Sequence, residues 1–231
     1  MVPNWISEQL RGRQSVIESS RRLAQRGQFG IDDLVQIALD DSAEIDFRVD
    51  AITLLTASTR SNESALRRLL ESRSKIIATE TLKRVREFGP EWAVSEILSK
   101  VRASNDPSER AVLAWALGGY PGRCDALEAL MGLLQSDSDD AVRSHAIESL
   151  SVFRSPVVVD ALLRVLEHGS VSERFWSIYS LGMIRDPGAV EAVSKCLQDE
   201  TEVPHFGTIS AEAKWALEEI KRPLRDGRQG G

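Results

Sequence analysis

Residues that carry catalysis or bind metals are scarce in this sequence of 231 residues. It has three histidines and two cysteines, and none of them shows the His-x-x-x-His or Cys-x-x-Cys spacing of a zinc site. It also lacks a glycine-rich phosphate loop and a Gly-x-Ser-x-Gly turn. These absences predict a protein that is not an enzyme and that has no metal ion or other cofactor.

Long apolar runs and an excess of positive charge are lacking as well. No stretch reaches the roughly 18 apolar residues of a transmembrane helix, and residues 1–8 lack the basic-then-apolar order of a signal peptide. The net charge is −6, whereas proteins that bind nucleic acid usually present a basic face. Cys124 and Cys196 are expected to be buried, reduced thiols. We therefore expect a cytoplasmic protein that binds neither membranes nor nucleic acid.

The sequence does contain one helical phrase that recurs six times. A basic residue is followed by a small or apolar residue three positions later and by leucine seven positions later. The copies are Arg48-Ala51-Leu55, Lys75-Ala78-Leu82, Arg110-Leu113-Leu117, Arg143-Ala146-Leu150, Arg174-Ser177-Leu181 and, without the basic residue, Ser210-Ala213-Leu217. A recurrence near 30 residues is typical of stacked helical repeats.

Glycine and proline divide these repeats into helix pairs. For example, Asp106-Pro107-Ser108-Glu109 predicts a helix start with a capping box, in which Asp106 and Glu109 satisfy free backbone N–H groups. First helices of the pairs are expected near 5–26, 43–58, 74–88, 106–119, 139–153, 171–184 and 209–221. Second helices are expected near 31–39, 62–71, 90–102, 122–135, 156–168 and 187–198. No strand pattern is visible, and residues 201–207 are expected to form the longest loop between helices.

Residues 139–150 (DDAVRSHAIESL) closely resemble the first helix of a HEAT-like repeat, in the short variety found in phycobilisome lyases. Residues 110–118 and 174–182 fit the same phrase, and the resemblance covers roughly residues 40–221. It implies an all-α fold, a right-handed α-solenoid of stacked helix pairs like a HEAT or ARM superhelix. We expect a single solenoid domain over 1–221, with about six helix pairs and a C-terminal capping helix, followed by a flexible tail at 222–231.

The resemblance does not extend to the iron site of one HEAT-like enzyme class. Deoxyhypusine hydroxylase holds iron with repeated His-Glu pairs. This chain has Ser144-His145 and Glu167-His168 but no His-Glu step.

The register of the phrase separates core positions from surface positions. Counted from the basic residue at position 0, positions 3, 4 and 7 face the core, and positions 2 and 5 lie opposite. In HEAT-like repeats an arginine at position 0 resembles part of an Asp/Arg ladder between successive units. Arg48, Arg110, Arg143 and Arg174 are therefore interpreted as structural residues.

Large aromatic residues occupy the outward positions 2 and 5. Trp115, Tyr179 and Trp215 stand at position 5 of their helices, and Trp176 stands at position 2. Tryptophan and tyrosine are enriched at binding hot spots, so these four residues are candidates for a contact patch. They are equally consistent with packing against adjacent first helices or against the 199–208 loop.

The second helices conventionally line the concave surface in this family. Their sequences predict a shallow groove with an alanine floor and charged margins, formed by Arg68, Glu128, Asp160, Arg164, Glu191 and Lys195. Asp160/Arg164 and Glu191/Lys195 are also i,i+4 pairs in the favourable acid-first order. Ordinary solvated ion pairs would explain them without a partner.

These features favour a non-catalytic module that binds a protein or peptide on an extended surface, and we expect a monomer. One alternative is a lyase-like or chromophore-handling protein, which depends only on the resemblance. A second alternative is an antitoxin-like or immunity-like inhibitor, in which the acidic chain blocks a basic effector.

Overall fold

The computed structural model describes residues 29–57 and 63–222 of the chain. Most of these residues are helical, and the chain divides into two compact units, unit 1 (Met1–Ala93) and unit 2 (Val94–Gly231). The all-α fold of stacked helix pairs predicted from the sequence is confirmed. The right-handed superhelix and the single domain over 1–221 stay predictions. The expected helix at 5–26 and the tail after 222 lie outside the described residues.

Unit 1 contains two layers of helices. Its described elements are α2 (Ile31–Leu39), α3 (Ile45–Ala57), α4 (Glu63–Leu70), α5 (Lys75–Phe88) and the start of α6 (Glu91–Ala103). Helix α3 packs on α2 and α5, and α4 packs on α2 and α5. Consecutive helices therefore share one core instead of folding as separate hairpins.

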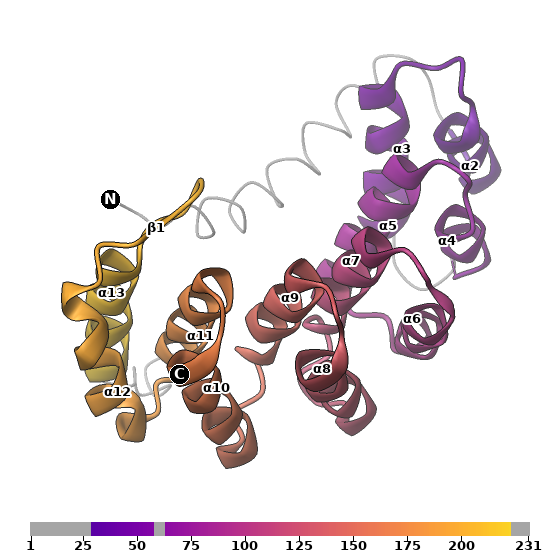
Figure 1. Ribbon diagram of the computed structural model, residues 1–231. Coiled ribbons are helices and arrows are strands. Elements are labelled where there is room, and N and C mark those ends of the chain that lie inside the picture. Colours follow the sequence, from indigo (N-terminus) through magenta and orange to yellow (C-terminus); the bar gives the residue numbers. More distant parts are fainter. Residues whose placement is uncertain (1–28, 58–62, 223–231) are drawn as a thin grey trace, which may run out of the picture. The chain divides into compact units, whose positions relative to one another are not determined.

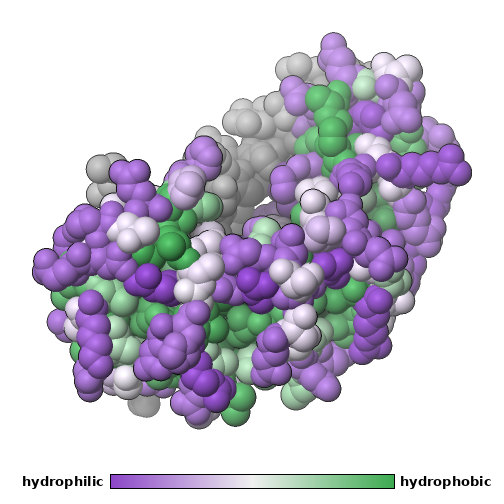
Figure 2. All heavy atoms as spheres, viewed as in Figure 1, coloured by the Kyte–Doolittle hydropathy of each residue, from purple (hydrophilic) through white to green (hydrophobic). Residues whose placement is uncertain are grey.

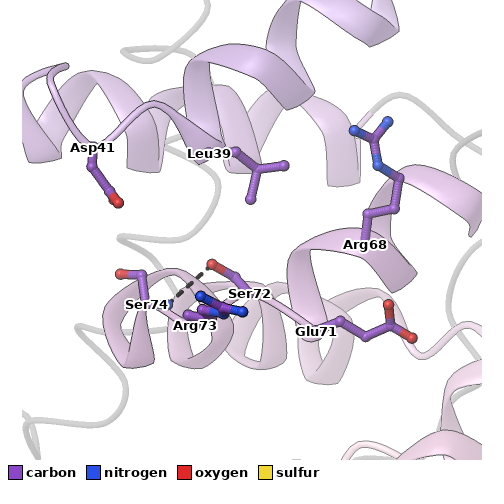
Figure 3. Close-up of a pocket in the computed structure, with 7 residues that line it drawn as sticks. All are labelled: Leu39, Asp41, Arg68, Glu71, Ser72, Arg73 and Ser74. Atoms are coloured by element: carbon purple, nitrogen blue, oxygen red, sulfur yellow. Dashed lines mark hydrogen bonds between the residues drawn. The ribbon is translucent and has the colours of Figure 1, made fainter.

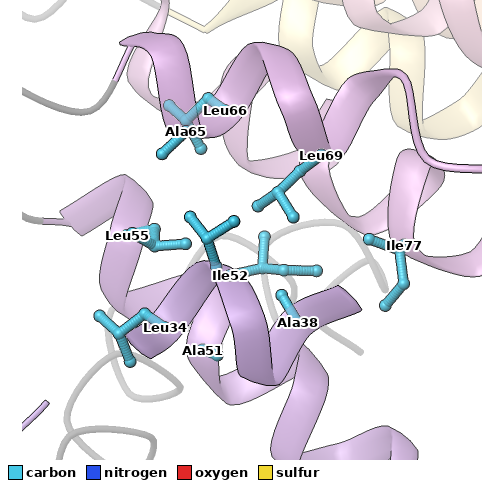
Figure 4. Close-up of a cluster of buried hydrophobic side chains, with 10 residues drawn as sticks. Leu34, Ala38, Ala51, Ile52, Leu55, Ala65, Leu66, Leu69 and Ile77 are labelled. Atoms are coloured by element: carbon cyan, nitrogen blue, oxygen red, sulfur yellow. The ribbon is translucent and has the colours of Figure 1, made fainter. Parts of the chain in front are cut away.

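The core of unit 1 is built from aliphatic side chains on α2, α3, α4 and α5 (Figure 4). Ile52, Leu69 and Ile77 are completely buried, and so is Ala38 of the same cluster. Trp92 of α6 packs against the edge of this core. Burying each of these three large side chains stabilises the folded state by roughly 2 kcal/mol.

Unit 2 continues the same pattern. Its elements after α6 are α7 (Pro107–Leu117), α8 (Cys124–Ser136), α9 (Asp140–Leu150), α10 (Pro156–His168), α11 (Val171–Ile184), η1 (Pro187–Ala189), α12 (Val190–Ser194), η2 (Lys195–Gln198), β1 (Glu202–Val203), β2 (Gly207–Thr208) and α13 (Ile209–Lys221). The second helix expected at 187–198 is thus a short α-helix between two 3₁₀ turns.

The first helices of unit 2, α7, α9, α11 and α13, pack directly on one another in sequence (Figure 1). Position 6 of these helices is always small, as Ala or Ser, which allows close approach. Ser149 Oγ donates to the backbone oxygen of Trp115 at 3.2 Å, and Ser180 Oγ donates to that of Ile147 at 2.8 Å. This closely packed layer lies on the inner side of the curve that unit 2 makes in Figure 1. The expectation that second helices line the concave surface is therefore wrong for this unit.

Side-chain caps begin several helices, as the sequence predicts, but the capping box lies elsewhere. Asp106 accepts from the backbone N–H of Ser108, whereas Glu109 accepts from Ser104 Oγ at 2.6 Å instead of closing the box. The capping box forms at the start of α11, where Ser170 and Glu173 bond reciprocally. The backbone N–H of Asp106, which a capping box would direct to Glu109, donates to Ser104 Oγ at 3.3 Å.

The segment expected to be the longest loop contains a small hairpin, which corrects the expectation of no strands. Strands β1 and β2 are antiparallel, with Glu202 opposite Thr208 and Val203 opposite Gly207. The hairpin needs two residues with positive φ, His205 at 70° in the turn and Gly207 at 114° at the start of β2. Two-residue strands are too short to produce an alternating pattern in the sequence.

Close packing of α11 on α13 leads to a prediction about Gly182. A Cβ atom added at Gly182 would lie 2.9 Å from Ala216 Cα and 2.9 Å from Trp215 Cζ3. Overpacking of this kind destabilises a fold by about 1–3 kcal/mol. The better helix propensity of alanine offsets less than about 1 kcal/mol of this loss. We expect Gly182→Ala to lower the free energy of unfolding by about 1–2 kcal/mol in urea titrations.

Gly132 is the matched control for this substitution. It lies within α8, is exposed, and would offer an added Cβ no atom within 4 Å. Gly132→Ala is expected to raise the free energy of unfolding by about 0.5–1 kcal/mol. If both variants shift the urea midpoint in the same direction, the close contact between α11 and α13 is not as described.

Candidate functional site

Three basic residues of the repeated phrase connect successive repeats of unit 2. Arg110 donates two hydrogen bonds to Asp137, at 2.7 and 3.0 Å, and Arg143 donates to Glu173 at 2.5 Å. Arg174 pairs with Asp199 in the same way. In each case the acidic partner lies 25 to 30 residues further along the chain. Arg48 differs, because it donates to the backbone oxygen of Ala38 at 3.1 Å and lies 2.8 Å from Asp41, both earlier in the chain. The structural role predicted for Arg110, Arg143 and Arg174 is therefore a connection between repeats, whereas Arg48 acts within its own part of unit 1.

The pKa values of the acidic partners reflect these contacts. The hydrogen bonds from Arg110 hold the pKa of Asp137 below its usual value. Burial alone would raise the pKa of Glu173, but hydrogen bonds from Arg143 and from the backbone of Ser170 outweigh burial and lower it. Both carboxylates are thus ionised at neutral pH and act as fixed anchors for the arginines.

The outward aromatic residues of α11 and α13 form a continuous cluster with the hairpin. We call Phe175, Trp176, Tyr179, Phe206 and Trp215 the aromatic cluster. Tyr179 stacks on Trp215 with ring centres 5.5 Å apart and an interplanar angle of 12°. Trp176 meets Tyr179 edge-on at 5.4 Å and Phe206 edge-on at 5.1 Å. The cluster therefore joins two first helices and the β1–β2 turn into one surface.

The aromatic cluster is packed on one side and open on the other. Trp176, Tyr179 and Trp215 are partly buried, and Phe206 is 56% exposed. Figure 2 shows an apolar patch beside the hairpin end of unit 2, set among hydrophilic residues. Packing against adjacent helices and exposure to solvent thus occur together in the same side chains. Sequence reasoning missed Phe206, because a loop aromatic gives no indication of its direction. It missed Phe175 because this buried residue stands at position 1 of α11, which the register assigned to neither face.

Trp115 lies outside the aromatic cluster but in the same row of positions. Its indole Nε1 donates to Glu148 Oε1 at 3.2 Å, and Glu148 also contacts His145 Nδ1 at 3.3 Å. Trp115, Glu148, Tyr179 and Trp215 all occupy position 5 of consecutive first helices. The inner face of unit 2 therefore combines aromatic rings with carboxylates.

Glu212 is another residue of this face that sequence reasoning missed. It occupies position 2 of α13, one turn before Trp215, and its side chain is partly buried. Burial raises the pKa of Glu212 to about 7. No hydrogen bond or ion pair to Glu212 occurs within residues 29–57 and 63–222. A half-buried carboxyl group without a cation is costly and therefore notable.

The charged residues predicted on the second helices are exposed and spread along both units. Glu191 and Lys195 form the expected ion pair, at 3.0 Å, with both side chains largely in solvent. Asp160 and Arg164 are exposed on α10 without an ion pair between them in the described part of the chain. Exposed pairs of this kind contribute roughly 0–1 kcal/mol. The binding role predicted for these charged residues stays a prediction.

Two shallow cavities lie beside the predicted charged residues. In unit 1, a cavity of about 400 Å³ is lined by Leu39, Asp41, Arg68, Glu71 and the turn from Ser72 to Ser74 (Figure 3). In unit 2, a cavity of about 480 Å³ lies between α8 and α10 and is lined in part by Ala161, Arg164 and His168. The alanine floor predicted for the second helices thus appears at Ala161. Glu128 of α8 is exposed and is not among the lining residues.

Chemistry-bearing side chains do not gather elsewhere in the described residues. No group of three or more His, Cys, Asp or Glu residues in 29–57 and 63–222 has the arrangement of a metal site. Cys196 is buried, and burial raises the pKa of its thiol, whereas Cys124 is exposed, contrary to expectation, because it is the first residue of α8. The helices in this part of the chain are too short or too polar to cross a membrane.

Comparison with known proteins gives matches at the level of repeats. Residues 94–182 match the sequence profile of HEAT repeats, and residues 173–199 match that of the PBS lyase HEAT-like repeat. No curated protein matches the chain. The second of these segments begins at Glu173, within α11, and ends at Asp199, just before the hairpin.

Two solved structures are similar to the chain at low sequence identity. Human deoxyhypusine hydroxylase, solved in complex with glycerol, is 18% identical over 82% of this chain and 73% of its own, with a TM-score of 0.44. An engineered protein is 21% identical over 84% of this chain and 97% of its own, with a TM-score of 0.45.

Proposed function

Because this chain is a HEAT-like repeat protein, we propose that it serves as a non-catalytic scaffold that binds a protein or peptide on the inner face of unit 2. The single observation that carries this proposal is the aromatic cluster. Burial of aromatic surface is strongly favourable in water, yet the side chain of Phe206 in this cluster is more than half exposed. Exposed aromatic groups on a preordered surface are typical anchors for a partner.

The arrangement of the repeats supports this choice of surface over the second helices. The arginine ladder and the close packing of first helices fix the backbone positions of α11 and α13. The aromatic rings are thereby held in place before a partner arrives, which reduces the entropy cost of binding. In contrast, Arg164 and Lys195 are long, exposed side chains that would lose that entropy on binding.

A selection of peptides on the whole protein tests the proposal. Dodecamer peptides displayed on phage are selected on the wild-type chain, and the best ones are titrated against two variants by calorimetry. We expect Trp176→Ala to weaken binding at least about thirtyfold, as loss of a hot-spot residue does. The second-helix variant Asp160→Lys/Arg164→Glu should bind like the wild type. The reverse pattern would move the binding surface to α10 and overturn the proposal.

A second candidate function is the handling of a linear tetrapyrrole. The match of residues 173–199 to the PBS lyase HEAT-like repeat favours it, since this segment carries three residues of the aromatic cluster. Mixing the purified chain with biliverdin distinguishes the two functions. A new visible absorbance band that Trp176→Ala abolishes would support chromophore handling over peptide binding.

A further inference from the structure

Glu212 and the aromatic cluster lie on the same side of the two last first helices. Contacts between α11 and α13 join Tyr179 to Trp215, Gly182 to Ala216 and Arg185 to Glu219. Residue numbers increase together along both helices, so α11 and α13 run parallel. One turn before the Tyr179–Trp215 stack, the same register places Trp176 beside Glu212.

This placement puts a carboxyl group at the edge of three aromatic rings. Trp176 is held by Phe206 on one side and by Tyr179 on the other, with ring centres 5.1 and 5.4 Å away. Lys214 lies two residues after Glu212 and therefore on the opposite side of α13. Glu212 has no cationic partner in the described part of the chain, in contrast to Asp137, Glu173 and Asp199, which each have an arginine.

The aromatic rings and the carboxyl group of Glu212 both favour a cation at this place. Ring faces attract cations through their quadrupole, and a partly buried carboxylate is stabilised by an ammonium or guanidinium group more than by water. The remaining charge of this face has the same sign, since Glu148 stands in the neighbouring row and Glu202 is exposed on the hairpin. Charge complementarity therefore specifies a positively charged occupant.

We propose that Glu212, Trp176, Tyr179 and Trp215 form a subsite for one lysine or arginine side chain of a partner polypeptide. This proposal depends on the proposed function, because it names the partner chemistry of the same surface. The ammonium or guanidinium group pairs with Glu212, and the methylene stem lies along the indole of Trp176. Phe206 covers an apolar residue next to the basic one.

A double-mutant cycle with a selected peptide tests the subsite. The probes are peptides from phage selection on the wild-type chain, in which we expect lysine or arginine next to an aliphatic or aromatic residue. Each lysine is then replaced by norleucine, or each arginine by citrulline, which removes the charge and keeps the stem. With the wild-type protein we expect this replacement to weaken binding about tenfold, as for a charge-assisted hydrogen bond. With Glu212→Gln the same replacement should change affinity less than about twofold.

Glu218, on the same helix as Glu212, provides the control. Glu218→Gln removes an exposed carboxylate from α13 and should behave like the wild type. The subsite is wrong if replacing the charged peptide residue weakens binding to Glu212→Gln as much as it weakens binding to the wild type. It is also wrong if the selected peptides carry no basic residue. The proposed function fails separately, if Trp176→Ala leaves peptide binding unchanged or if selection yields no peptide at all.

Discussion

Arg143→Met is expected to lower the free energy of unfolding by about 3 kcal/mol at pH 7, the lower end of the cost of breaking a buried ion pair. Arg143 donates to Glu173 at 2.5 Å, to the backbone oxygen of Asp137 at 2.8 Å and to Asp140 at 3.3 Å. Glu173 is buried, with only 9% of its side chain exposed, so it would stay charged without a cation. Urea unfolding followed by circular dichroism measures the change.

The pH dependence identifies the ion pair as the cause. The pKa of Glu173 in the folded protein is below its ordinary value of 4.5, so the carboxylate stabilises the fold above that pH and loses this effect as pH falls through the folded value. The difference between wild type and Arg143→Met should therefore shrink when the pH is lowered from 7 to about 3.5. Glu173 still accepts from the backbone of Ser170 at 2.7 Å in either protein.

Two further variants control this result. Arg164→Met removes an exposed arginine from α10 and should change stability by less than about 0.5 kcal/mol. Arg143→Met/Glu173→Gln removes the uncompensated charge and keeps the helix cap, so we expect it to recover at least about half of the loss. A double variant as unstable as Arg143→Met would show that the ladder does not act through charge pairing.

Glu212→Gln is expected to stabilise the protein at alkaline pH. The pKa of Glu212 is raised from 4.5 to about 7 in the folded state, so the folded chain holds a proton that the unfolded chain releases. Wild-type stability therefore falls as pH rises from about 4.5 to about 7 and stays low above that range. Glutamine carries no charge and escapes this loss, which is at most about 3 kcal/mol for a shift of this size.

Thermal unfolding between pH 4.5 and 8.5 measures the effect. The stability of Glu212→Gln should equal that of the wild type near pH 4.5 and exceed it increasingly up to pH 8. Glu218→Gln, on the exposed side of α13, should follow the wild-type curve. Parallel curves for wild type and Glu212→Gln over this pH range would mean that Glu212 is not buried among the aromatic residues.

Helix positions were predictable from the sequence because their signals are local. The expected bounds 31–39, 156–168, 171–184 and 209–221 agree with α2, α10, α11 and α13. Helix caps, prolines and leucine spacing act within one or two helical turns, so the helix bounds that they predict do not depend on the tertiary packing. The arginine ladder was predictable for Arg110, Arg143 and Arg174, which pair with acidic residues 25 to 30 positions later, but not for Arg48, which pairs with Asp41 instead.

The functional surface was only partly predictable. The register placed Trp176, Tyr179 and Trp215 on one face, but it did not show that Tyr179 would stack on Trp215. Phe206 joins them because a positive φ at His205 turns the hairpin back toward α11, a long-range effect without a local signal. Glu212 looked like any polar surface residue, since burial depends on its neighbours.

Which helices form the inner face of unit 2 depends on the spacing between helices, which the sequence shows only indirectly. Small residues at position 6, such as Ser149 and Ser180, bring first helices together and place them on the inner side of unit 2 (Figure 1). A family convention pointed to the second helices instead. The charged side chains there, including Arg68, Glu128 and Glu191, remain exposed groups whose role is not assigned by any contact within the protein.

Partners that bind the aromatic cluster would cover the inner face of unit 2. Hydrogen–deuterium exchange of the full chain, with and without a phage-selected peptide, locates the surface that is covered. We expect slower amide exchange in α11, the β1–β2 hairpin and α13 when the peptide is bound. Protection confined to α8 and α10, with α11 and α13 unchanged, would contradict this expectation.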